Sequence, residues 1–413
     1  MKKIFDMTLL LLALALPVQA QTLTYPEYMQ AVAEKNTSYL AEKHNVDIAT
    51  ANLQAAKVFN DPELSVDYTN NQDWYMLMGQ SLEFALSYDL DISGNRRARI
   101  RAASSEKEIT EASVAAFLCN LRFEAAQAWA EAWRLQKSVA LTKEGVRDME
   151  LIARSDSLRL KAGDVGRADA TQSHLEAQTM RGQLTQMEAE YRSSLMDLSL
   201  LMGGESVSAL GTEDLPITGR TYDEQELFLL AENHREDLKA AELGQTLSEN
   251  NLKMVKASRI PELGLSLGYS YNNEVRNEIA PAPKVNGLSV GISIPLKFSS
   301  LNKGGLNAAK AEVLQSQKIY ETARLQVHTE VAQAYTRLQA ARKVLTQYDG
   351  TMISDARQVL ESRKAGYLKG ESSLLDLLTA QRTYQDVMLS YVQAQCDCYV
   401  CEVSLQHAIG IGQ

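Results

Sequence analysis

The sequence has few of the residues from which large compact cores are built. Aromatic residues make up only 7% of its 413 residues, and the mean hydropathy is −0.24 although 45% of the residues are hydrophobic. A chain that relies on Ala, Leu and Gln instead suits long helices packed in narrow layers. The formal net charge of −10 argues against nucleic-acid binding, because such binding needs basic residues that release counterions.

The sequence also lacks the motifs of catalytic and cofactor sites. It contains no phosphate-binding loop, dinucleotide fingerprint, nucleophile elbow or HExxH motif, and its five His residues show no ligand spacing. Cys396 and Cys398 would point ~200° apart on a helix, and Cys119 and Cys401 would differ in height by ~20 Å. Cys398 and Cys401 do share a face, but we expect packing thiols and no metal. Because the catalytic and cofactor motifs are missing, we also expect no cofactor and no enzyme.

Long apolar runs are missing after the N-terminus. Lys2 and Lys3 precede an apolar stretch, residues 9–16, and Val18-Gln19-Ala20 offers a small-residue cleavage site. Residues 1–20 are therefore expected to be a secretory signal peptide. Since no later run could form a transmembrane helix, a membrane-embedded mature chain would have to use strands.

Two regions, 62–90 and 261–298, each show a pair of alternating stretches. In the first region, Leu64, Val66 and Tyr68 alternate with polar residues, and a similar alternation runs from residue 81 to residue 90. The second region begins with Pro-Glu-Leu at 261–263, as the first does at 62–64. Period two predicts four strands, each with one apolar and one polar face.

The rest of the chain is predicted to be long helices arranged in a tandem repeat. Residues 96–162 contain no Pro and one Gly, so a single helix there would span ~100 Å. A turn near Gly163 and a return helix, 167–202, complete the first hairpin. After a linker, 206–220, the plan recurs at an offset of about 200, with a helix at about 306–369 and a turn near Gly370. The repeats are thus residues 21–205 and 221–413.

Four strands are too few to close a membrane barrel, which needs at least about eight in a single chain. Open sheet edges are not tolerated in lipid. Either the strands form an ordinary half-buried sheet in the periplasm, or several chains share one barrel. We favour the shared barrel, because a soluble sheet would not explain why each strand pair adjoins a very long helical hairpin.

With these features, the chain resembles the TolC family of outer-membrane efflux proteins over essentially its whole mature length. The motifs that carry the resemblance are LKAGDVGRAD at 160–169 and KGESSLLDLLTAQ at 369–381, and LDISGNRRAR at 90–99 resembles the CusC and CzcC branch. The resemblance implies a mainly α protein with membrane β: a homotrimer with a twelve-helix α-barrel in the periplasm and a shared twelve-stranded β-barrel in the outer membrane of a Gram-negative bacterium. It also implies a periplasmic adaptor and an inner-membrane pump, either a resistance-nodulation-division (RND) antiporter or an ABC transporter.

The resemblance assigns two kinds of site. The tips are expected to contact the adaptor as well as to reverse the chain, through Ala162, Gly163, Asp164, Val165, Lys369, Gly370, Glu371 and Ser372. Asp376 corresponds to a pore-facing carboxylate that closes the periplasmic entrance, although it could instead be a helix N-terminal carboxylate facing the dipole. For Asp169, at the matching place in the first half, we favour this structural role. The family's second acidic gate position is occupied here by Thr379.

We therefore predict a passive exit duct of a tripartite pump, for drugs or metal ions. One alternative keeps the fold but exports proteins through a type I secretion system. The other is a soluble periplasmic coiled-coil scaffold, which osmotic shock would release without detergent.

Overall fold

The two halves of the chain fold into the same succession of elements. The computed structural model describes residues 23–71, 77–220, 222–296 and 303–411, so the predicted signal peptide lies outside the described residues. The first half comprises α2 (Tyr25–Lys35), α3 (Thr37–Lys57), β1 (Glu63–Asn70), β2 (Gln80–Leu90), α4 (Asn95–Ala162) and α5 (Arg167–Leu201). The second half comprises α6 (Glu224–His234), α7 (Glu236–Ala257), β3 (Leu263–Asn272), β4 (Val285–Ser293), α8 (Lys303–Gln347), η2 (Tyr348–Met352), α9 (Ile353–Lys369) and α10 (Leu374–Ala408).

Helix α4 confirms the predicted unbroken helix at 96–162. Its start is fixed by Asp91, whose carboxylate accepts the backbone N–H groups of Ser93 at 3.0 Å, Asn95 at 3.2 Å and Arg96 at 2.6 Å. These N–H groups lie where a helix N-terminus leaves donors without intrahelical partners. The Asp-Ile-Ser-Gly-Asn-Arg sequence therefore ends a strand and starts a helix within five residues.

The prediction of one helix over 306–369 is wrong, because the helix is interrupted at Gly350. This residue has φ −77° and ψ −136°, outside the helical region, and it lies within the π-helical turn η2 between α8 and α9. Glycine adopts such a conformation at low cost because it has no Cβ. The corresponding helix of the first half, α4, has no such break.

The described residues group into two units, and each unit draws on both halves of the chain. The first contains the described residues of Met1–Ala41, Ala116–Arg235 and Gln326–Gln413, and the second contains those of Glu42–Ala115 and Glu236–Leu325. In the first unit, Tyr28 stacks on Trp129 with ring centroids 5.3 Å apart, and Trp133 is 2% exposed. Both tryptophans, one helical turn apart on α4, therefore pack between helices.

The linker at 206–220 packs against the helices of the first unit. Leu210 is 2% exposed, and the indole of Trp133 donates to the carbonyl oxygen of Glu213 at 3.1 Å. The buried carboxylate of Glu402 accepts the backbone N–H of Thr218 at 3.1 Å. Burial raises the pKa of Glu402, whereas nearby Arg342 and the Thr218 hydrogen bond act in the opposite direction. This segment without regular structure is thus held by specific contacts.

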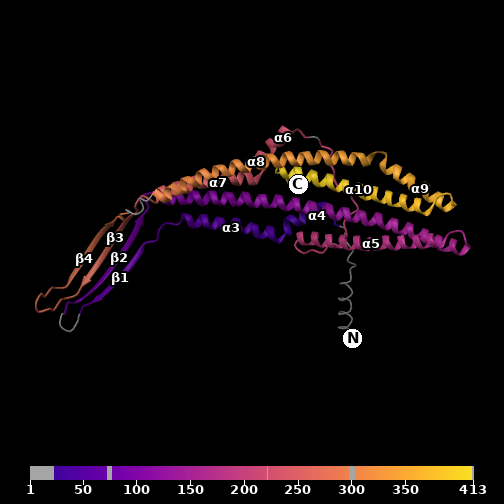
Figure 1. The fold of residues 1–413 in the computed structure, drawn as a ribbon. Coiled ribbons are helices and arrows are strands. Elements are labelled where there is room, and N and C mark those ends of the chain that lie inside the picture. Colours follow the sequence, from indigo (N-terminus) through magenta and orange to yellow (C-terminus); the bar gives the residue numbers. More distant parts are fainter. Residues whose placement is uncertain (1–22, 72–76, 221, 297–302, 412–413) are drawn as a thin grey trace, which may run out of the picture. The chain divides into compact units, whose positions relative to one another are not determined.

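The second unit contains one antiparallel sheet in the order β1-β2-β3-β4 (Figure 1). Its register aligns the alternating residues of all four strands, which confirms the predicted strand pairs. One row across the sheet is Leu64, Leu86, Leu267 and Val290, and the next is Val66, Phe84, Tyr269 and Leu288. We call this surface the apolar face. Its side chains are exposed within the described chain, up to 78% at Val290.

The opposite, polar face differs between the two strand pairs. On β1 and β2 it carries Glu63, Asp67, Glu83 and Asp89, whereas on β3 and β4 each Gly faces a Ser: Gly264 and Ser293, Ser266 and Gly291, Gly268 and Ser289, Ser270 and Gly287. A Cβ added at any of these four glycines would lie 2.2 to 2.7 Å from the opposing hydroxyl oxygen. The β3–β4 part of the polar face is therefore smooth and uncharged.

Strand β4 is shorter than the alternation suggests. It ends at Ser293, which pairs with Gly264 next to the first residue of β3. Beyond that point no partner strand continues, and Pro295 has no N–H to donate. Residues 297 and 298, the last of the predicted stretch, lie outside the described residues.

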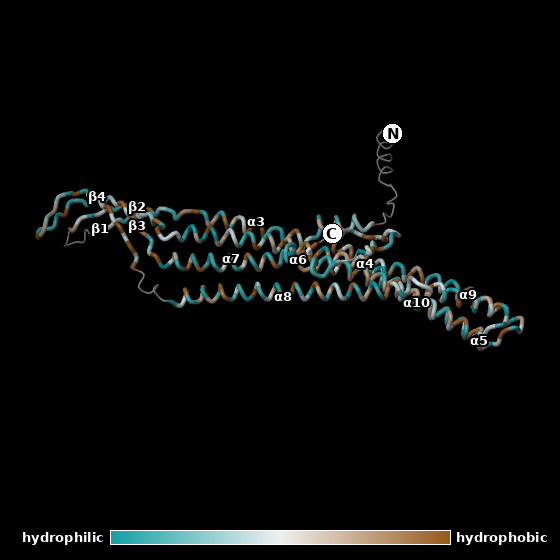
Figure 2. Tube along the Cα trace, turned by 90° about the horizontal axis from the view of Figure 1, so that it is seen from above, coloured by the Kyte–Doolittle hydropathy of each residue, from teal (hydrophilic) through white to brown (hydrophobic). Residues whose placement is uncertain are grey.

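Among the described helices, none combines the length and the hydrophobicity needed to cross a bilayer. Figure 2 shows hydrophilic and hydrophobic residues interspersed along α8.

Candidate functional site

The two helix reversals are built alike. Gly163 and Gly370 adopt left-handed conformations, with φ of +86° and +80°, which side chains strongly disfavour. Asp164 N–H donates to the Arg159 carbonyl at 2.9 Å, and Glu371 N–H donates to the Gly366 carbonyl at 2.8 Å. These 6→1 bonds close each helix with a Schellman-type turn. All the predicted contact residues at the tips are exposed except Val165 and Ser372, which are half-buried.

Asp376 lies in a capping box at the start of α10. Its Oδ2 accepts from the Ser373 hydroxyl at 2.9 Å and from the Ser373 N–H at 3.3 Å, while the Ser373 hydroxyl oxygen accepts the Asp376 N–H at 3.2 Å. The Ser373 hydrogen bonds hold the pKa of Asp376 below its ordinary value. The structural role weighed from the sequence is therefore realised, and the carboxylate remains exposed and charged.

Asp169 differs from Asp376 in its surroundings. The N-cap of α5 is Gly166, which has no side chain to complete a capping box. Asp169 is exposed in the first turn of α5, where a negative charge interacts favourably with the helix dipole. The two aspartates thus occupy matching positions with unequal contacts.

A buried polar cluster close to the tips was not predicted from the sequence. The Tyr367 hydroxyl on α9 donates to Oδ1 of Asp156 on α4 at 2.8 Å, and Asp156 is completely buried. The Arg159 guanidinium lies 5.4 Å from the centre of the Tyr367 ring and 3.9 Å from the Asp156 carboxylate. Burial, together with Asp156, raises the pKa of Tyr367, so the phenol keeps the proton that it donates.

Two ion pairs also join the first helical hairpin to the second. Lys364 on α9 contacts Asp148 on α4 at 3.2 Å, and Arg382 on α10 contacts Glu176 on α5 through two hydrogen bonds, the shorter at 2.7 Å. Both pairs are partly exposed, so each contributes little to stability by itself. Together with Tyr367, they connect α9 and α10 to α4 and α5 near the reversals.

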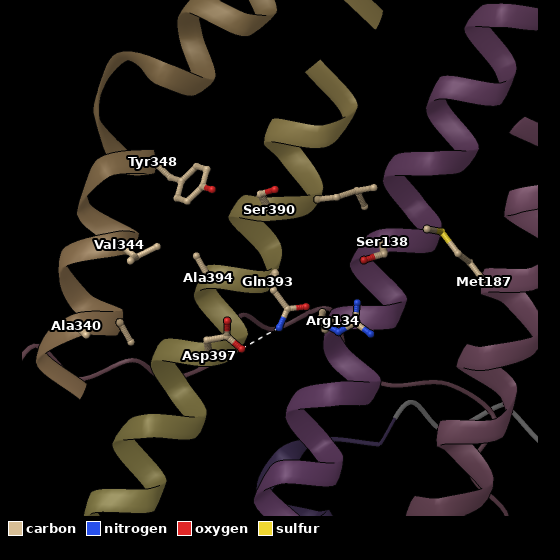
Figure 3. A pocket seen from close by; sticks show the side chains of 12 residues that line it. Arg134, Ser138, Met187, Ala340, Val344, Tyr348, Ser390, Gln393, Ala394 and Asp397 are labelled. Atoms are coloured by element: carbon tan, nitrogen blue, oxygen red, sulfur yellow. Dashed lines mark hydrogen bonds between the residues drawn. The ribbon is translucent and has the colours of Figure 1, made fainter. Parts of the chain in front are cut away.

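A cavity of about 590 Å³ lies between α4, α5, α8 and α10 (Figure 3). Its charged side chains already have partners: Gln393 donates to Asp397 at 2.8 Å, and Arg134 pairs with Glu131 at 2.5 Å. The Ser138 and Ser390 hydroxyls lie apart in the lining, with no His beside either. The described lining therefore lacks the paired nucleophile and base used in covalent catalysis.

The cysteines are placed as packing thiols. None of the four forms a disulfide, and Cys396 and Cys398 are buried. Burial raises the pKa of the Cys396 thiol to about 12, so it stays protonated and is a poor metal ligand. In the part of the chain that the structure describes, no three His, Cys, Asp or Glu side chains gather as metal ligands.

Comparison with known proteins identifies the fold and the family. The model of the outer membrane efflux protein family matches residues 28–204 and 227–411, one segment in each half. The chain belongs to the outer membrane efflux protein family. It is therefore an efflux duct of the outer membrane, and the soluble scaffold weighed from the sequence is not supported.

Relatives from two organisms align with most of this efflux protein. The cobalt-zinc-cadmium resistance protein CzcC of Cupriavidus metallidurans is 23% identical over 397 residues, which cover 95% of this chain and 91% of CzcC. The pyoverdine export outer membrane protein OpmQ of Pseudomonas aeruginosa is 24% identical over 370 residues, which cover 88% of this chain and 76% of OpmQ.

Solved structures show the same fold at low sequence identity. The outer-membrane channel OprN superposes with a TM-score of 0.78 at 19% identity, covering 94% of this chain and 90% of OprN. CusC superposes with a TM-score of 0.77 at 19% identity, covering 93% of this chain and 91% of CusC. These channels have the TolC-like fold that the sequence predicted.

Proposed function

We propose that three copies of this chain assemble into one efflux duct. The observation that carries the proposal is the sheet, in which β1 and β4 each pair with one neighbour and the apolar face is exposed. An apolar surface of this kind is costly in water, and an open sheet edge is not tolerated in lipid. Three four-stranded sheets would pair their edges into a twelve-stranded barrel, with the apolar faces toward outer-membrane lipid.

The long hairpins of three copies would form a twelve-helix barrel in the periplasm. The tips at 162–165 and 369–372 would receive a periplasmic adaptor, which couples the duct to an inner-membrane RND or ABC transporter. Their exposure supports this role, since backbone turns alone do not require exposed side chains. Residues 1–20 would direct the chain out of the cytoplasm.

Asp376 would form the periplasmic gate. Threefold symmetry would turn this exposed carboxylate into a ring of three, and such a ring favours cations. The Ser373 hydrogen bonds lower the pKa of each Asp376 carboxyl and so favour its charged form. The capping box does not compete with this role, because only one carboxylate oxygen accepts the Ser373 hydrogen bonds.

The substrate class we propose is divalent metal cations, on the similarity to CzcC over 95% of this chain. Deleting the gene should lower resistance to Co²⁺, Zn²⁺ or Cd²⁺, and a plasmid copy should restore it, with a panel of hydrophobic dyes measured in parallel. Loss of dye efflux alone would make drugs the substrate. Loss of a secreted polypeptide with unchanged metal and dye resistance would favour type I secretion and contradict the proposal.

A further inference from the structure

The helix ends next to the sheet carry charge of one sign. Helices α3 and α7 end there, and α4 and α8 begin there (Figure 1). The eight helical residues closest to the strands in these four helices are 50–57, 95–102, 250–257 and 303–310, and they include no Asp or Glu. They contain nine basic residues, which we call the basic collar: Lys57, Arg96, Arg97, Arg99, Arg101, Lys253, Lys256, Lys303 and Lys310.

The collar contrasts with the chain as a whole, in which 52 acidic residues outnumber 42 basic ones. Its arginines at the start of α4 also depart from the charge preference of a helix N-terminus. Four arginines occupy the first two turns of α4, and the first turn has no acidic residue. Basic side chains at a helix N-terminus oppose the helix dipole, which favours anions there. Departures from local preference of this kind concentrate at functional sites.

Internal contacts account for only part of the collar. Arg96 donates to the Lys57 carbonyl and lies 3.8 Å above the centre of the Phe59 ring. Arg99 donates to the Ala56 carbonyl at 3.3 Å and to the Val58 carbonyl at 3.0 Å. These two arginines thereby cap the carbonyl end of α3.

Other collar residues point to an external anion. Arg97 and Arg101 are exposed and one helical turn apart, and neither makes an ion pair within the described residues. Lys256 and Lys303, at the ends of α7 and α8, are likewise exposed without an ion pair to a described residue. The collar thus presents basic groups from three helices that have no acidic partner in the described chain.

Acidic residues in the connecting segments do not neutralise the collar. These segments contribute Asp61, Asp91 and Glu262, and also the basic Arg259. Asp91 already accepts the N-terminal N–H groups of α4. The region next to the sheet therefore remains net positive.

We propose that the basic collar binds the phosphates of anionic phospholipids at the membrane surface from which the helices extend. The segments that connect the strands to the collar add exposed apolar side chains, Val58 at 56%, Phe59 at 64%, Ile92 at 61% and Ile260 at 46%. Apolar side chains would enter hydrocarbon there while long basic side chains extend to the headgroups. The inference rests on the proposed function, since it requires the apolar face to lie in lipid.

The test uses the full-length mature protein, extracted in detergent and mixed with equal amounts of phosphatidylglycerol and phosphatidylcholine. Native mass spectrometry gives the ratio of the two bound lipids. The collar variant combines Arg97→Gln, Arg101→Gln, Lys256→Gln and Lys303→Gln. The control variant removes the same charge elsewhere with Lys143→Gln, Arg147→Gln, Arg192→Gln and Lys343→Gln, four exposed basic residues.

Wild type and the control should prefer phosphatidylglycerol, and the collar variant should lose at least about tenfold of that preference. If the collar variant still needs detergent for extraction but keeps its preference for phosphatidylglycerol, the lipid-binding role of the collar is overturned and the proposed function stands. Displacement of phosphatidylglycerol by inorganic phosphate would also overturn this role, by showing a simple anion site. Release of the wild type without detergent would instead overturn the proposed function.

Discussion

Tyr367 and Asp156 lie 211 positions apart in the sequence and share a buried hydrogen bond of 2.8 Å. The other carboxylate oxygen of Asp156 has no hydrogen-bond partner among the described residues. The phenol is therefore the main partner of a buried carboxylate, and it fastens α9 to α4 three residues before the Gly370 turn. Any widening between the two hairpins at this level has to break this bond.

Tyr367→Phe should loosen the tips. Losing a hydrogen bond to a buried charged group costs about 1.5–3 kcal/mol, enough to shift an equilibrium between closed and open tips by tenfold or more. Single-channel conductance in planar bilayers should rise several-fold. Tyr384→Phe is the matched control, because that hydroxyl only accepts a 3.4 Å hydrogen bond from the exposed Arg357. Equal conductance in both variants would show that the Tyr367 bond does not restrain the tips.

Asp376→Ala should raise conductance or weaken cation preference, because it removes the carboxylate ring. Ser373→Ala separates the two roles, since it removes the capping partner and leaves the charge. Asp169→Ala, at the matching position, should have little effect. If Ser373→Ala and Asp376→Ala changed ion selectivity equally, capping alone would explain Asp376.

The selectivity should also depend on pH in one direction. Hydrogen bonds from Ser373 lower the pKa of Asp376 in the single chain, whereas neighbouring carboxylates in a ring would raise it, because like charges disfavour the charged form. Cation preference should therefore hold at neutral pH and be lost in acid, as the carboxylates are protonated. Reversal potentials measured from pH 7 to pH 3 would contradict the ring if the preference did not fall in acid.

Val290→Lys should impair insertion into the outer membrane, whereas Ser289→Lys should not. The two residues are neighbours on β4 and point to opposite faces. A Lys on a lipid-facing strand costs about 2–4 kcal/mol near the bilayer centre, while the polar face tolerates charge. The amount of protein in outer-membrane fractions gives the answer, and equal amounts for both variants would argue against a lipid-facing apolar face.

Gly203→Ala should destabilise the protein more than Gly204→Ala. Both residues have positive φ, but a Cβ at Gly203 would lie 2.4 Å from the Lys35 carbonyl oxygen, whereas nothing lies within 4 Å of one at Gly204. Since both changes strain the backbone, the difference in stability between the two variants reports the contact with the Lys35 carbonyl oxygen. Overpacking of this kind costs about 1–3 kcal/mol. Equal midpoints of chemical denaturation would show that the backbone at Lys35 can move away.

How much the sequence could predict depended on whether a feature is local. Alternation along each strand was enough for the apolar face, and the absence of Pro was enough for α4. The break at Gly350 was not predictable, because a single Gly is tolerated inside many helices. The hydrogen bond between Tyr367 and Asp156 was not predictable either. It depends on how α9 packs against α4, and the sequence of α4 alone does not show that Asp156 is buried.

The candidate sites divide in the same way. The reversals at Gly163 and Gly370 follow from local turn chemistry and were located correctly. The capping role of Asp376 was an alternative in the sequence, where Ser373 three residues earlier is its signal. Its place in a charged ring depends on neighbouring copies of the chain and stays a prediction.

The most direct test of the shared barrel is the molar mass of the detergent-extracted protein by light scattering, after fractionation of the cell envelope. A shared barrel predicts protein in the outer membrane with a mass of about three mature chains after the detergent contribution is subtracted. A monomer released by osmotic shock without detergent would contradict it, because the apolar face would then be exposed to water and the edges of β1 and β4 would need no neighbour.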